Sequence, residues 1–349
     1  MLDANADRAA EGLRVTGDIA RFVLEDQNLA ESLRSVRAEH WKILSRIPGV
    51  QEKGLQSRDS IGDIGRNYAT PAHQDLYALA QSNLHRVQES FRVLEESLRS
   101  IAPNCVSYYT QLRYRCYDIE PDFLQKLQQW SMQKKLDFGL YVVLGSEFSC
   151  GRDFGEVAEK AIAGGTGAIQ LRDKCMEKRE LLSWAYRLRK LTRERNVTFI
   201  INDHIDIALA VDADGVHLGQ NDFPIPEARS ILGPHKIIGA STHSLEQAQR
   251  AVAEGASYFN IGPIFATGTK KTSVAPVGPD LITLITNVIQ HPFTVMGGIK
   301  LHNVDEVLKR GARRIAVVTA VVGEPDITAA ARAFTDKINR SVHSDTETN

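Results

Sequence analysis

The chain has 349 residues, of which 43% are hydrophobic, and this length fits about two domains of ordinary size. Its formal net charge of −1 argues against partners bound by bulk charge, such as nucleic acid or an anionic membrane surface. No apolar run approaches the roughly 18 residues of a membrane span, and no secretory signal is visible at the N-terminus. The four cysteines lack metal-like or CxxC spacing, which favours free thiols and a cytoplasmic location.

Residues 1–125 are predicted to form an all-helical N-terminal domain, because apolar positions recur at intervals of three and four residues. An internal repeat runs through this region and indicates a duplicated helical hairpin. The matching positions are Asn5, Arg8, Glu11, Leu13, Arg14 and Val15 in the first copy, and Asn83, Arg86, Glu89, Phe91, Arg92 and Val93 in the second.

Asn5, Arg8 and Glu11 are spaced three apart, so they share one helix face. We favour a salt-bridge ladder or a helix–helix seam there, and the alternative is a small anion or phosphorylated ligand held between the two copies. The Gly- and Ser-rich segment from Gly54 to Ala72 is predicted to be the connecting loop, with a binding loop as the alternative. A non-catalytic sensor or assembly role for this domain also stays open.

Pro121 is expected to end the helical domain, and residues 126–139 are predicted to form a bridging helix or linker. From residue 140 onward, short Val- and Ile-rich runs alternate with amphipathic helical stretches. The predicted strands are 140–144, 168–171, 198–201, 215–218, 236–240, 258–262, 293–296 and 314–318, and the predicted helices are 155–164, 177–195, 204–210, 224–232, 245–254, 279–290, 303–310 and 326–340.

Eight β/α units in roughly 200 residues are typical of a (β/α)8 TIM barrel, which we predict over residues 140–340. A doubly wound open sheet is the alternative, although it more often has fewer strands. The polar tail 341–349 is predicted to be disordered.

Two carboxylates follow adjacent predicted strands. In a parallel sheet, functional side chains gather beyond the carboxyl ends of the strands, so Asp203 and Asp222 are expected on one rim of the barrel. Neighbouring carboxylates repel each other unless a divalent cation lies between them, and Mg2+ typically binds one or two carboxylates together with water and phosphate oxygens. Helix N-capping is the alternative for either residue alone, but the pair favours one Mg2+.

Gln170, Arg172 and Lys174 alternate along the chain, so an extended strand would direct all three side chains to one face. If that face lines the barrel mouth, an amide donor and two cations converge there, and Arg can bind a phosphate in a bidentate manner. The alternative is a solvated strand end whose cations pair with Glu177 and Glu180.

The loop 264–279 after the sixth predicted strand is rich in hydroxyl and basic side chains, including Thr267, Thr269 and Lys270. Loops at this rim carry function in barrels, so the segment is suited to close over an oxyanion. A surface loop without a ligand is the alternative.

The loops after the seventh and eighth predicted strands contain Gly297-Gly298 and Thr319. Barrels frequently bind a phosphate with these two loops, and glycine lets backbone N–H groups approach an anion closely. A simple turn is the alternative for the glycine pair.

The motifs occur in the order found in thiamine phosphate synthase, a (β/α)8 enzyme family that the chain resembles over about residues 140–340. The resemblance lies in QLRDK (170–174), Asn202-Asp203, HLGQND (217–222), ATGTKK (266–271), MGGI (296–299) and VVTA (317–320). The chain departs from the family at Ala266, where Pro is usual, and at Thr319, where Ser is usual. The helical region is similar to an extension found on some members, notably in cyanobacteria and planctomycetes.

The resemblance implies a role for individual residues. A pyrimidine diphosphate would be bound by Gln170, Leu171, Arg172, Asp173, Lys174, Asn202, Ser241 and Lys270, and a thiazole phosphate by Thr267, Thr269, Gly298, Val318 and Thr319. Asp203 and Asp222 would hold one Mg2+. Arg172, Lys174 and Lys270 would be catalytic, because they would stabilise the charge on the departing group.

The implied reaction joins hydroxymethylpyrimidine diphosphate to a thiazole phosphate, or to its carboxylated form, and yields thiamine phosphate and pyrophosphate through a dissociative, Mg-assisted displacement. The expected partners are these two phosphorylated small molecules, without nucleic acid or membrane, and the sequence leaves homo-oligomer formation open. The alternative on the same barrel is a thiazole tautomerase-type isomerase. It would use a His base such as His243 and needs neither the metal pair nor the diphosphate clamp.

Overall fold

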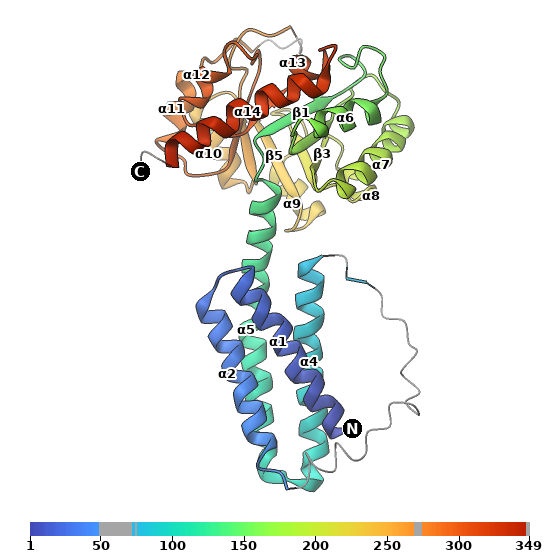
Figure 1. The fold of residues 1–349 in the computed structure, drawn as a ribbon, viewed down its shortest axis with the longest axis vertical. Helices are drawn as coiled ribbons and strands as arrows, with labels where there is room; N and C mark the ends of the chain where they lie inside the picture. The colour runs from blue at the N-terminus through green and yellow to red at the C-terminus, as the bar shows by residue number, and fades with distance from the viewer. Residues whose placement is uncertain (49–71, 74, 269–273, 347–349) are drawn as a thin grey trace. The chain divides into compact units, whose positions relative to one another are not determined.

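The computed structural model describes residues 1–48, 72–73, 75–268 and 274–346, with side chains described as far as residue 341. By internal contacts the chain divides into two compact units, Met1–Ser131 and Met132–Asn349, and Figure 1 shows the elements of each. In the described part of the chain, no helix combines the length and the apolar character needed to cross a membrane.

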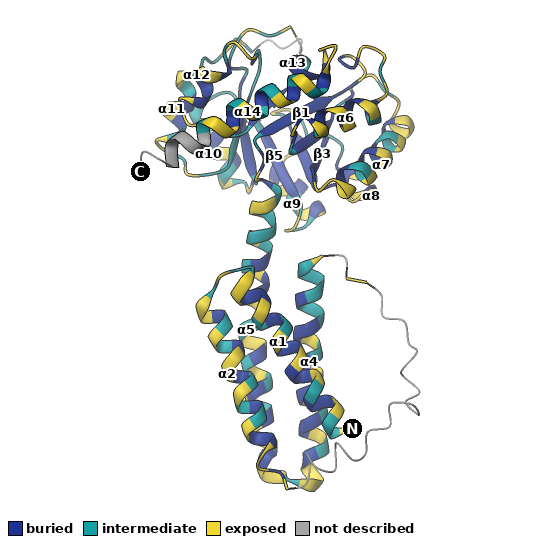
Figure 2. Ribbon diagram, in the orientation of Figure 1, coloured by how far each residue is buried: buried dark blue, intermediate teal, exposed yellow. Residues whose placement is uncertain are grey.

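In its described residues the first unit contains helices and the turns between them but no strand, as predicted. Its elements are α1 (Leu2–Phe22), α2 (Gln27–Leu44), α4 (Leu76–Ile101), the 3-10 turn η1 (Pro103–Cys105) and α5 (Val106–Lys135). Two aspartates begin helices as N-caps: the carboxylate of Asp26 accepts from the backbone of Leu29 at 2.9 Å, and that of Asp75 accepts from Ala78 at 2.8 Å. Each helix buries one apolar stripe against its neighbours (Figure 2).

The helices α1 and α4, which carry the matched repeat positions, lie in close contact. A Cβ added at Gly12 of α1 would lie 2.7 Å from Val87 Cγ2 and 2.9 Å from the carbonyl oxygen of Asn83. The amides of Asn5 and Asn83 each donate to a carbonyl four residues earlier, that of Met1 at the start of α1 and that of Leu79 within α4. These bonds stabilise each helix separately, so the duplication and a ligand between the copies both stay predictions. The predicted loop from Gly54 to Ala72 lies almost wholly outside the described residues.

The predicted end of the helical region at Pro121 is wrong, because α5 continues through this proline to Lys135. An internal proline costs a helix roughly 3 kcal/mol. Here Phe123, Leu124 and Leu127 follow it and bury their side chains in the core of the first unit. This packing favours continuation of the helix.

The second unit is a closed barrel of eight parallel strands in sequential order, as predicted, so the open-sheet alternative is excluded. The strands are β1 (Leu140–Leu144), β2 (Ala168–Leu171), β3 (Thr198–Asn202), β4 (Gly215–Leu218), β5 (Ile237–Thr242), β6 (Tyr258–Ile261), β7 (Phe293–Met296) and β8 (Ile315–Val317). β1 and β8 close the ring, with Leu140 paired to Ile315.

Helices surround the strands (Figure 1). They are α6 (Phe154–Ala163), α7 (Lys178–Glu194), α8 (Ile205–Ala210), α9 (Ile225–Leu232), α10 (Leu245–Ala253), α11 (Asp280–Thr286), α12 (Val304–Leu308), α13 (Thr319–Val322) and α14 (Ile327–Thr346). The short α13 was not predicted. The disordered tail was predicted to start too early, because α14 continues to Thr346; the segment from Ser341 to Thr346 contains no proline or glycine to end it.

Alternation along the strands separates two apolar cores. Leu140, Val142 and Leu144 of β1 face the surrounding helices in the larger core, whereas Tyr141 lies inside the barrel. The inner core contains Leu136, Phe138, Tyr141, Ala168, Ile200, Ile237, Tyr258 and Ala316. Figure 2 shows the strands as the most deeply buried part of this unit. Since the inner core fills one end of the barrel, the polar inward positions near the strand ends are left to form a site.

Candidate active site

A cavity of about 840 Å3 lies at the carboxyl ends of the strands. Residues from all eight strands or from the loops that follow them border it. They include Gln170, Arg172, Asn202, His217, Ser241, Asn260, Thr267, Gly298, Lys300, Val318 and Thr319. Most residues predicted to contact a substrate therefore lie around one space. Thr269 and Lys270 fall outside the described residues.

The strand end after β2 departs from the predicted alternation. β2 ends at Leu171. Of the three side chains predicted to share a face, Gln170 and Arg172 border the cavity and Lys174 does not. The guanidinium of Arg172 lies 4.0 Å from the carboxylate of Glu147. Lys174 instead extends along the rim, where its Nζ lies 3.2 Å from Asp203 Oδ2. The reason is that the chain leaves the extended conformation after Leu171.

Asp173 accounts for this change of direction. Its carboxylate accepts hydrogen bonds from the backbone N–H groups of Ser146, Cys175 and Met176 at 2.7, 3.0 and 2.9 Å. Burial is the largest single influence on the pKa of Asp173 and raises it. The hydrogen bonds together outweigh burial, so the pKa is lowered. The side chain holds two loops together, and its predicted substrate contact stays a prediction. Leu171 packs into the outer core, so only its backbone is available for a ligand.

Asp203 and Asp222 are neighbours on the rim, as the strand order predicted. Asp203 follows β3 in the left-handed backbone region, with φ of 60°, and its N–H donates to the carbonyl of His217. The carboxylate of Asp222 accepts from the N–H of Gly219 at 2.7 Å. A non-glycine residue at positive φ is strained and tends to occur where surrounding structure and function require it.

The capping alternative for this pair is wrong. The N-cap residues of α8 and α9 are His204 and Pro224, and neither helix start has a side-chain cap. Burial first, and then the nearby Asp222 carboxylate, raise the pKa of Asp203, while Lys174 lowers it. Crowded carboxylates of this kind are suited to bind a cation. Within the described ranges, no three His, Cys, Asp or Glu side chains form a metal-binding group, so any ion would need further oxygen ligands from elsewhere.

A chain of hydrogen bonds crosses the barrel and borders the cavity at Gln170, His217 and Ser241. Gln170 Nε2 donates to the hydroxyl of Tyr141 at 2.5 Å, and this hydroxyl lies 3.2 Å from that of Tyr258. The Tyr258 hydroxyl lies 2.9 Å from Nδ1 of His217, and Nε2 of His217 lies 3.0 Å from Ser241 Oγ. The sequence analysis named Gln170, His217 (in HLGQND) and Ser241, but the two tyrosines have only strand alternation to indicate that they point inward.

The opposite side of the cavity is formed by the loops after β7 and β8. Gly297 and Gly298 both have positive φ, 101° and 67°. Lys300 Nζ donates to Thr319 Oγ1 at 3.1 Å, and Val318 also borders the cavity. Sequence reasoning missed Lys300, although it directly follows the MGGI segment.

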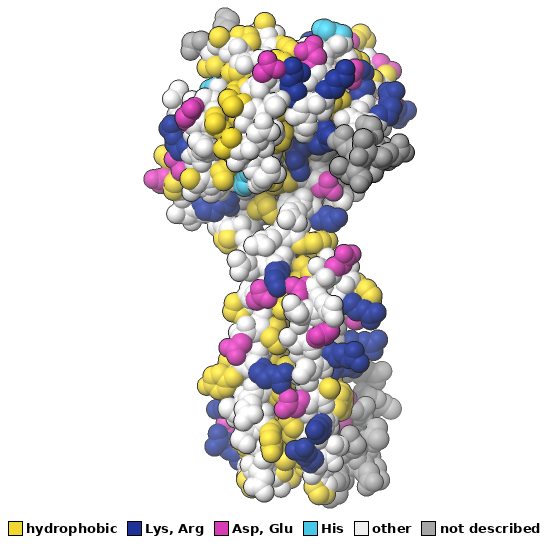
Figure 3. Space-filling view, turned by 90° about the vertical axis from the view of Figure 1, so that its left-hand side faces the viewer, with side chains coloured by type: hydrophobic (Ala, Val, Ile, Leu, Met, Phe, Trp, Pro, Cys, Tyr) yellow, Lys and Arg dark blue, Asp and Glu magenta, His cyan; other side chains and the backbone are white. Residues whose placement is uncertain are grey.

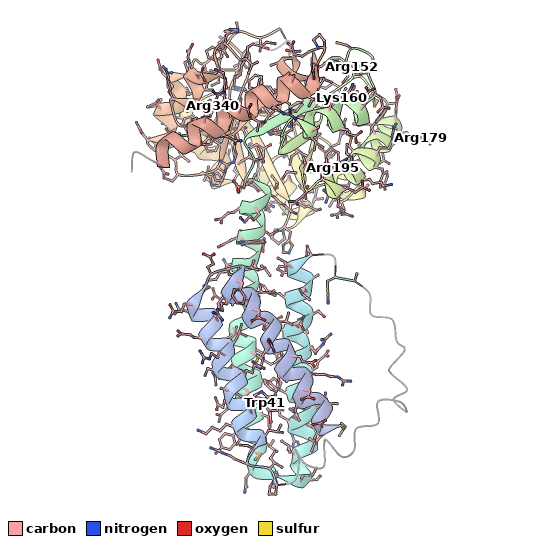
Figure 4. The ribbon with its side chains drawn as sticks, in the orientation of Figure 1. Trp41, Arg152, Lys160, Arg179, Arg195 and Arg340 are labelled. Atoms are coloured by element: carbon pink, nitrogen blue, oxygen red, sulfur yellow. The ribbon has the colours of Figure 1, made fainter. Side chains whose placement is uncertain are left out.

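Charges elsewhere on the molecule are mostly balanced locally. Basic and acidic side chains are interspersed over the visible face of each unit in Figure 3. Lys160 and Arg195, labelled in Figure 4 on α6 and at the end of α7, pair with Glu156 and Glu159 at 2.7 and 3.5 Å. The cavity is therefore distinguished by its arrangement of cations and amide donors around one space.

Comparisons with known proteins agree with the two-unit division. Residues 140–321 match the family model described as thiamine monophosphate synthase, and residues 1–122 match the ThiD2 family. A thiamine-phosphate synthase of Synechocystis sp. is 38% identical over 97% of this chain and 96% of its own length. That of Shouchella clausii is 51% identical over 56% of this chain and 94% of its own length.

A solved structure, thiamine phosphate pyrophosphorylase from Pyrococcus furiosus, matches with a TM-score of 0.55 and 37% identity, and the match covers 60% of this chain and 98% of that one. Its length corresponds to the barrel alone. Because the family model matches more than half of the chain and a relative matches nearly all of it, the chain belongs to the thiamine monophosphate synthase family.

Proposed function

We propose that the barrel condenses a hydroxymethylpyrimidine diphosphate with a thiazole phosphate to give thiamine phosphate and pyrophosphate. Membership of the family makes the chain a transferase. The observation that carries the proposal is a single cavity with Arg172 on one side and Gly298, Lys300 and Thr319 on another. A condensing enzyme for two phosphorylated substrates needs two such anion sites facing one space.

The diphosphate would bind at the side formed by the ends of β2, β3 and β5. Arg172 and Lys174 would bind the phosphate oxygens, with Lys270 of the undescribed segment as a further cation. Gln170, Asn202 and Ser241 would add hydrogen bonds. When the C–O bond between the pyrimidine methylene and the diphosphate breaks, its electron pair goes to the diphosphate oxygen, so these groups stabilise charge where it increases.

Asp203 and Asp222 would hold one Mg2+ at the outer edge of this side. Two crowded carboxylates provide part of a magnesium ligand set, and substrate phosphate oxygens and water would complete it. The bound ion would supply Lewis-acid stabilisation of the leaving diphosphate. Lys174 touches Asp203, so the metal ligands and the predicted diphosphate ligands form one continuous surface.

The thiazole phosphate would bind at the opposite side. The backbone at Gly298 and Val318, the hydroxyl groups of Thr267 and Thr319 and the ammonium of Lys300 would bind it, with Thr269 as a predicted further contact. Such binding orients the thiazole nitrogen toward the pyrimidine methylene carbon. Its lone pair then forms the C–N bond of the product, and no protein nucleophile is required.

The test is an assay of pyrophosphate release and thiamine phosphate formation with each component omitted in turn. We expect product only when the pyrimidine diphosphate, the thiazole phosphate and Mg2+ are all present. Turnover of the thiazole compound without the pyrimidine would instead support the isomerase alternative. Full activity in the presence of a chelator would contradict the role of Asp203 and Asp222.

A further inference from the structure

We infer that Tyr258 and His217 act as positioning residues, which hold the Ser241 hydroxyl as a hydrogen-bond donor directed at the bound anion. The inference rests on the proposed function for the identity of that anion, a diphosphate. It assigns to the barrel interior a part in substrate binding beyond the residues on the rim.

The first step is the direction of the bonds in the buried chain. An amide nitrogen can only donate, so Tyr141 must accept the proton from Gln170 Nε2. Each hydroxyl has a single proton to donate. If Tyr141 gives its proton to Tyr258, the Tyr258 proton is directed to Nδ1 of His217 at 2.9 Å. Every bond then has one donor and one acceptor.

The second step is the tautomer of His217. A neutral imidazole has one donor and one acceptor nitrogen. With Nδ1 accepting from Tyr258, the ring proton lies on Nε2 and is donated to Ser241 Oγ at 3.0 Å. Ser241 thereby accepts one bond and keeps its own proton, which it can donate into the cavity that it borders.

The opposite polarity would be unsuited to an anion. If Nε2 of His217 were the acceptor, Ser241 would donate its proton to the ring. It would then present only lone pairs to a phosphate oxygen. Of the two groups bonded to the Tyr141 hydroxyl, Gln170 Nε2 and the Tyr258 hydroxyl, only the second can accept the Tyr141 proton. This polarity makes Ser241 a donor. Both ends of the chain, Gln170 and Ser241, belong to the residues predicted to bind the diphosphate.

The third step is the rigidity of the chain. Gln170, Tyr141 and Tyr258 are each at most 1% exposed, and His217 is 6% exposed. Burial raises the pKa of both tyrosines, so they stay protonated donors. Gly239 on β5 makes the arrangement sterically feasible, because a Cβ there would overlap the Tyr258 ring. A buried chain that is fully bonded is costly to rearrange.

One experiment reads the tautomer directly and needs no catalysis. The full chain is labelled with 15N-histidine, and the signals of His217 are assigned by their loss in His217→Asn. We expect a pyridine-type shift at Nδ1 and a protonated Nε2 in the unmutated protein, and loss of this single tautomer in Tyr258→Phe. A protonated Nδ1 in the unmutated protein would overturn the inference.

A second experiment tests whether Tyr258 acts through Ser241. We expect Tyr258→Phe to raise the KM for the pyrimidine diphosphate and the Kd for Mg-pyrophosphate by roughly 10-fold, the size expected for one hydrogen bond to a charged group. In the Ser241→Ala background, Tyr258→Phe should have no further effect on KM or Kd. In the Ser241→Thr background, which keeps a hydroxyl, Tyr258→Phe should still raise both constants. Additive effects of Tyr258→Phe and Ser241→Ala would contradict the inference.

Tyr186→Phe is the matched control, because it removes a tyrosine hydroxyl bonded to the carbonyl of Ala210 on the outer helices. It should change neither KM nor Kd. The two proposals fail in different ways. If the unmutated chain makes no thiamine phosphate, the proposed function fails, while the His217 tautomer and the pyrophosphate affinities still decide the positioning role.

Discussion

The ammonium of Lys174 lies 3.2 Å from the carboxylate of Asp203, so a predicted diphosphate ligand and a predicted metal ligand are in direct contact. In the absence of a cation, Lys174 partly neutralises the acidic pair. A divalent ion bound by Asp203 and Asp222 would weaken this ion pair and free the ammonium for the phosphate oxygens. The contact would therefore link metal binding to the availability of a substrate ligand.

The first prediction concerns this acidic pair. We expect Asp203→Asn and Asp222→Asn each to lower kcat by roughly 100- to 1000-fold, because charge on the leaving diphosphate loses preorganised stabilisation. Initial rates across a Mg2+ titration would measure the loss and any shift in the ion concentration required. Asp206→Asn is the control, since Asp206 is an exposed residue of α8 that pairs with Lys178. Equal effects at Asp206 and Asp203 would contradict a metal-binding role.

The sequence predicted the barrel well because its strands are marked by buried Val- and Ile-rich runs and its rim by polar clusters. It failed where tertiary contacts decide the outcome. Pro121 does not end α5, since the apolar residues after it are buried in the helical core. Lys174 does not share a face with Gln170, since the Asp173 carboxylate turns the chain after β2.

The interior of the site was predictable only in part. Alternation places Tyr141 and Tyr258 inside the barrel, but no local pattern indicates that their hydroxyl groups meet at 3.2 Å. That contact depends on the register of strands far apart in the sequence. The direction of the bonds through His217 likewise depends on three-dimensional neighbours.

The second prediction concerns Lys300, which donates to Thr319 at the edge of the cavity. We expect Lys300→Met to raise the KM for the thiazole phosphate by roughly 10- to 100-fold, as for a lost hydrogen bond to a charged group, with little change in the KM for the pyrimidine diphosphate. Steady-state kinetics with each substrate varied in turn would separate the two. Lys309→Met, at the end of α12, is the control. A selective rise in the KM for the pyrimidine diphosphate would contradict the prediction, because it would indicate that Lys300 binds the diphosphate.

The third prediction separates backbone strain from crowding at Gly298. A Cβ at this residue would lie 2.5 Å from the Ala266 carbonyl oxygen and 2.8 Å from Phe265 Cβ, with φ at 67°. At Gly311 φ is 88° but no atom lies within 4 Å of the added Cβ. We expect Gly311→Ala to lower the free energy of unfolding by roughly 1–2 kcal/mol, the cost of the left-handed conformation.

Gly298→Ala should cost roughly a further 1–3 kcal/mol from overpacking and should also raise the KM for the thiazole phosphate. Urea denaturation followed by Trp184 fluorescence would report on the barrel, in which this residue packs against the core. If both variants lost the same stability, the contacts with Ala266 and Phe265 would carry no cost.

The fourth prediction concerns the independence of the barrel. The relative from Shouchella clausii matches only 56% of this chain over 94% of its own length. We therefore expect residues 132–349 alone to fold and to form thiamine phosphate at a rate similar to that of the full chain. Circular dichroism and the condensation assay would test this, and gel filtration would show whether residues 1–131 change the size of the assembly. A folded but inactive barrel would indicate that the helical unit contributes to catalysis.

The fifth prediction concerns His40 in the core of the helical unit. Its Nε2 lies 3.1 Å from the carbonyl of Ala6, and its Nδ1 lies 3.3 Å from the hydroxyl of Tyr109. Burial lowers the pKa of His40 from 6.5 to about 4, opposed by the bond to Ala6 and helped by the charge of Arg37. Between these two pH values, the unfolded chain binds a proton that the folded unit excludes.

Stability of this unit should therefore be complete above about pH 6.5 and fall as the pH approaches about 4, by roughly 3 kcal/mol in total. The His40→Gln variant can keep a polar contact without titrating, so its stability should vary much less over this range. Trp41 reports the transition, because its ring centroid lies 5.0 Å from that of His40 on α2 (Figure 4). Denaturant titrations from pH 7 to 4, in chains with Trp130→Phe and Trp184→Phe, would isolate its fluorescence. The same pH slope in both proteins would show that a group other than His40 controls the acid sensitivity of the helical unit.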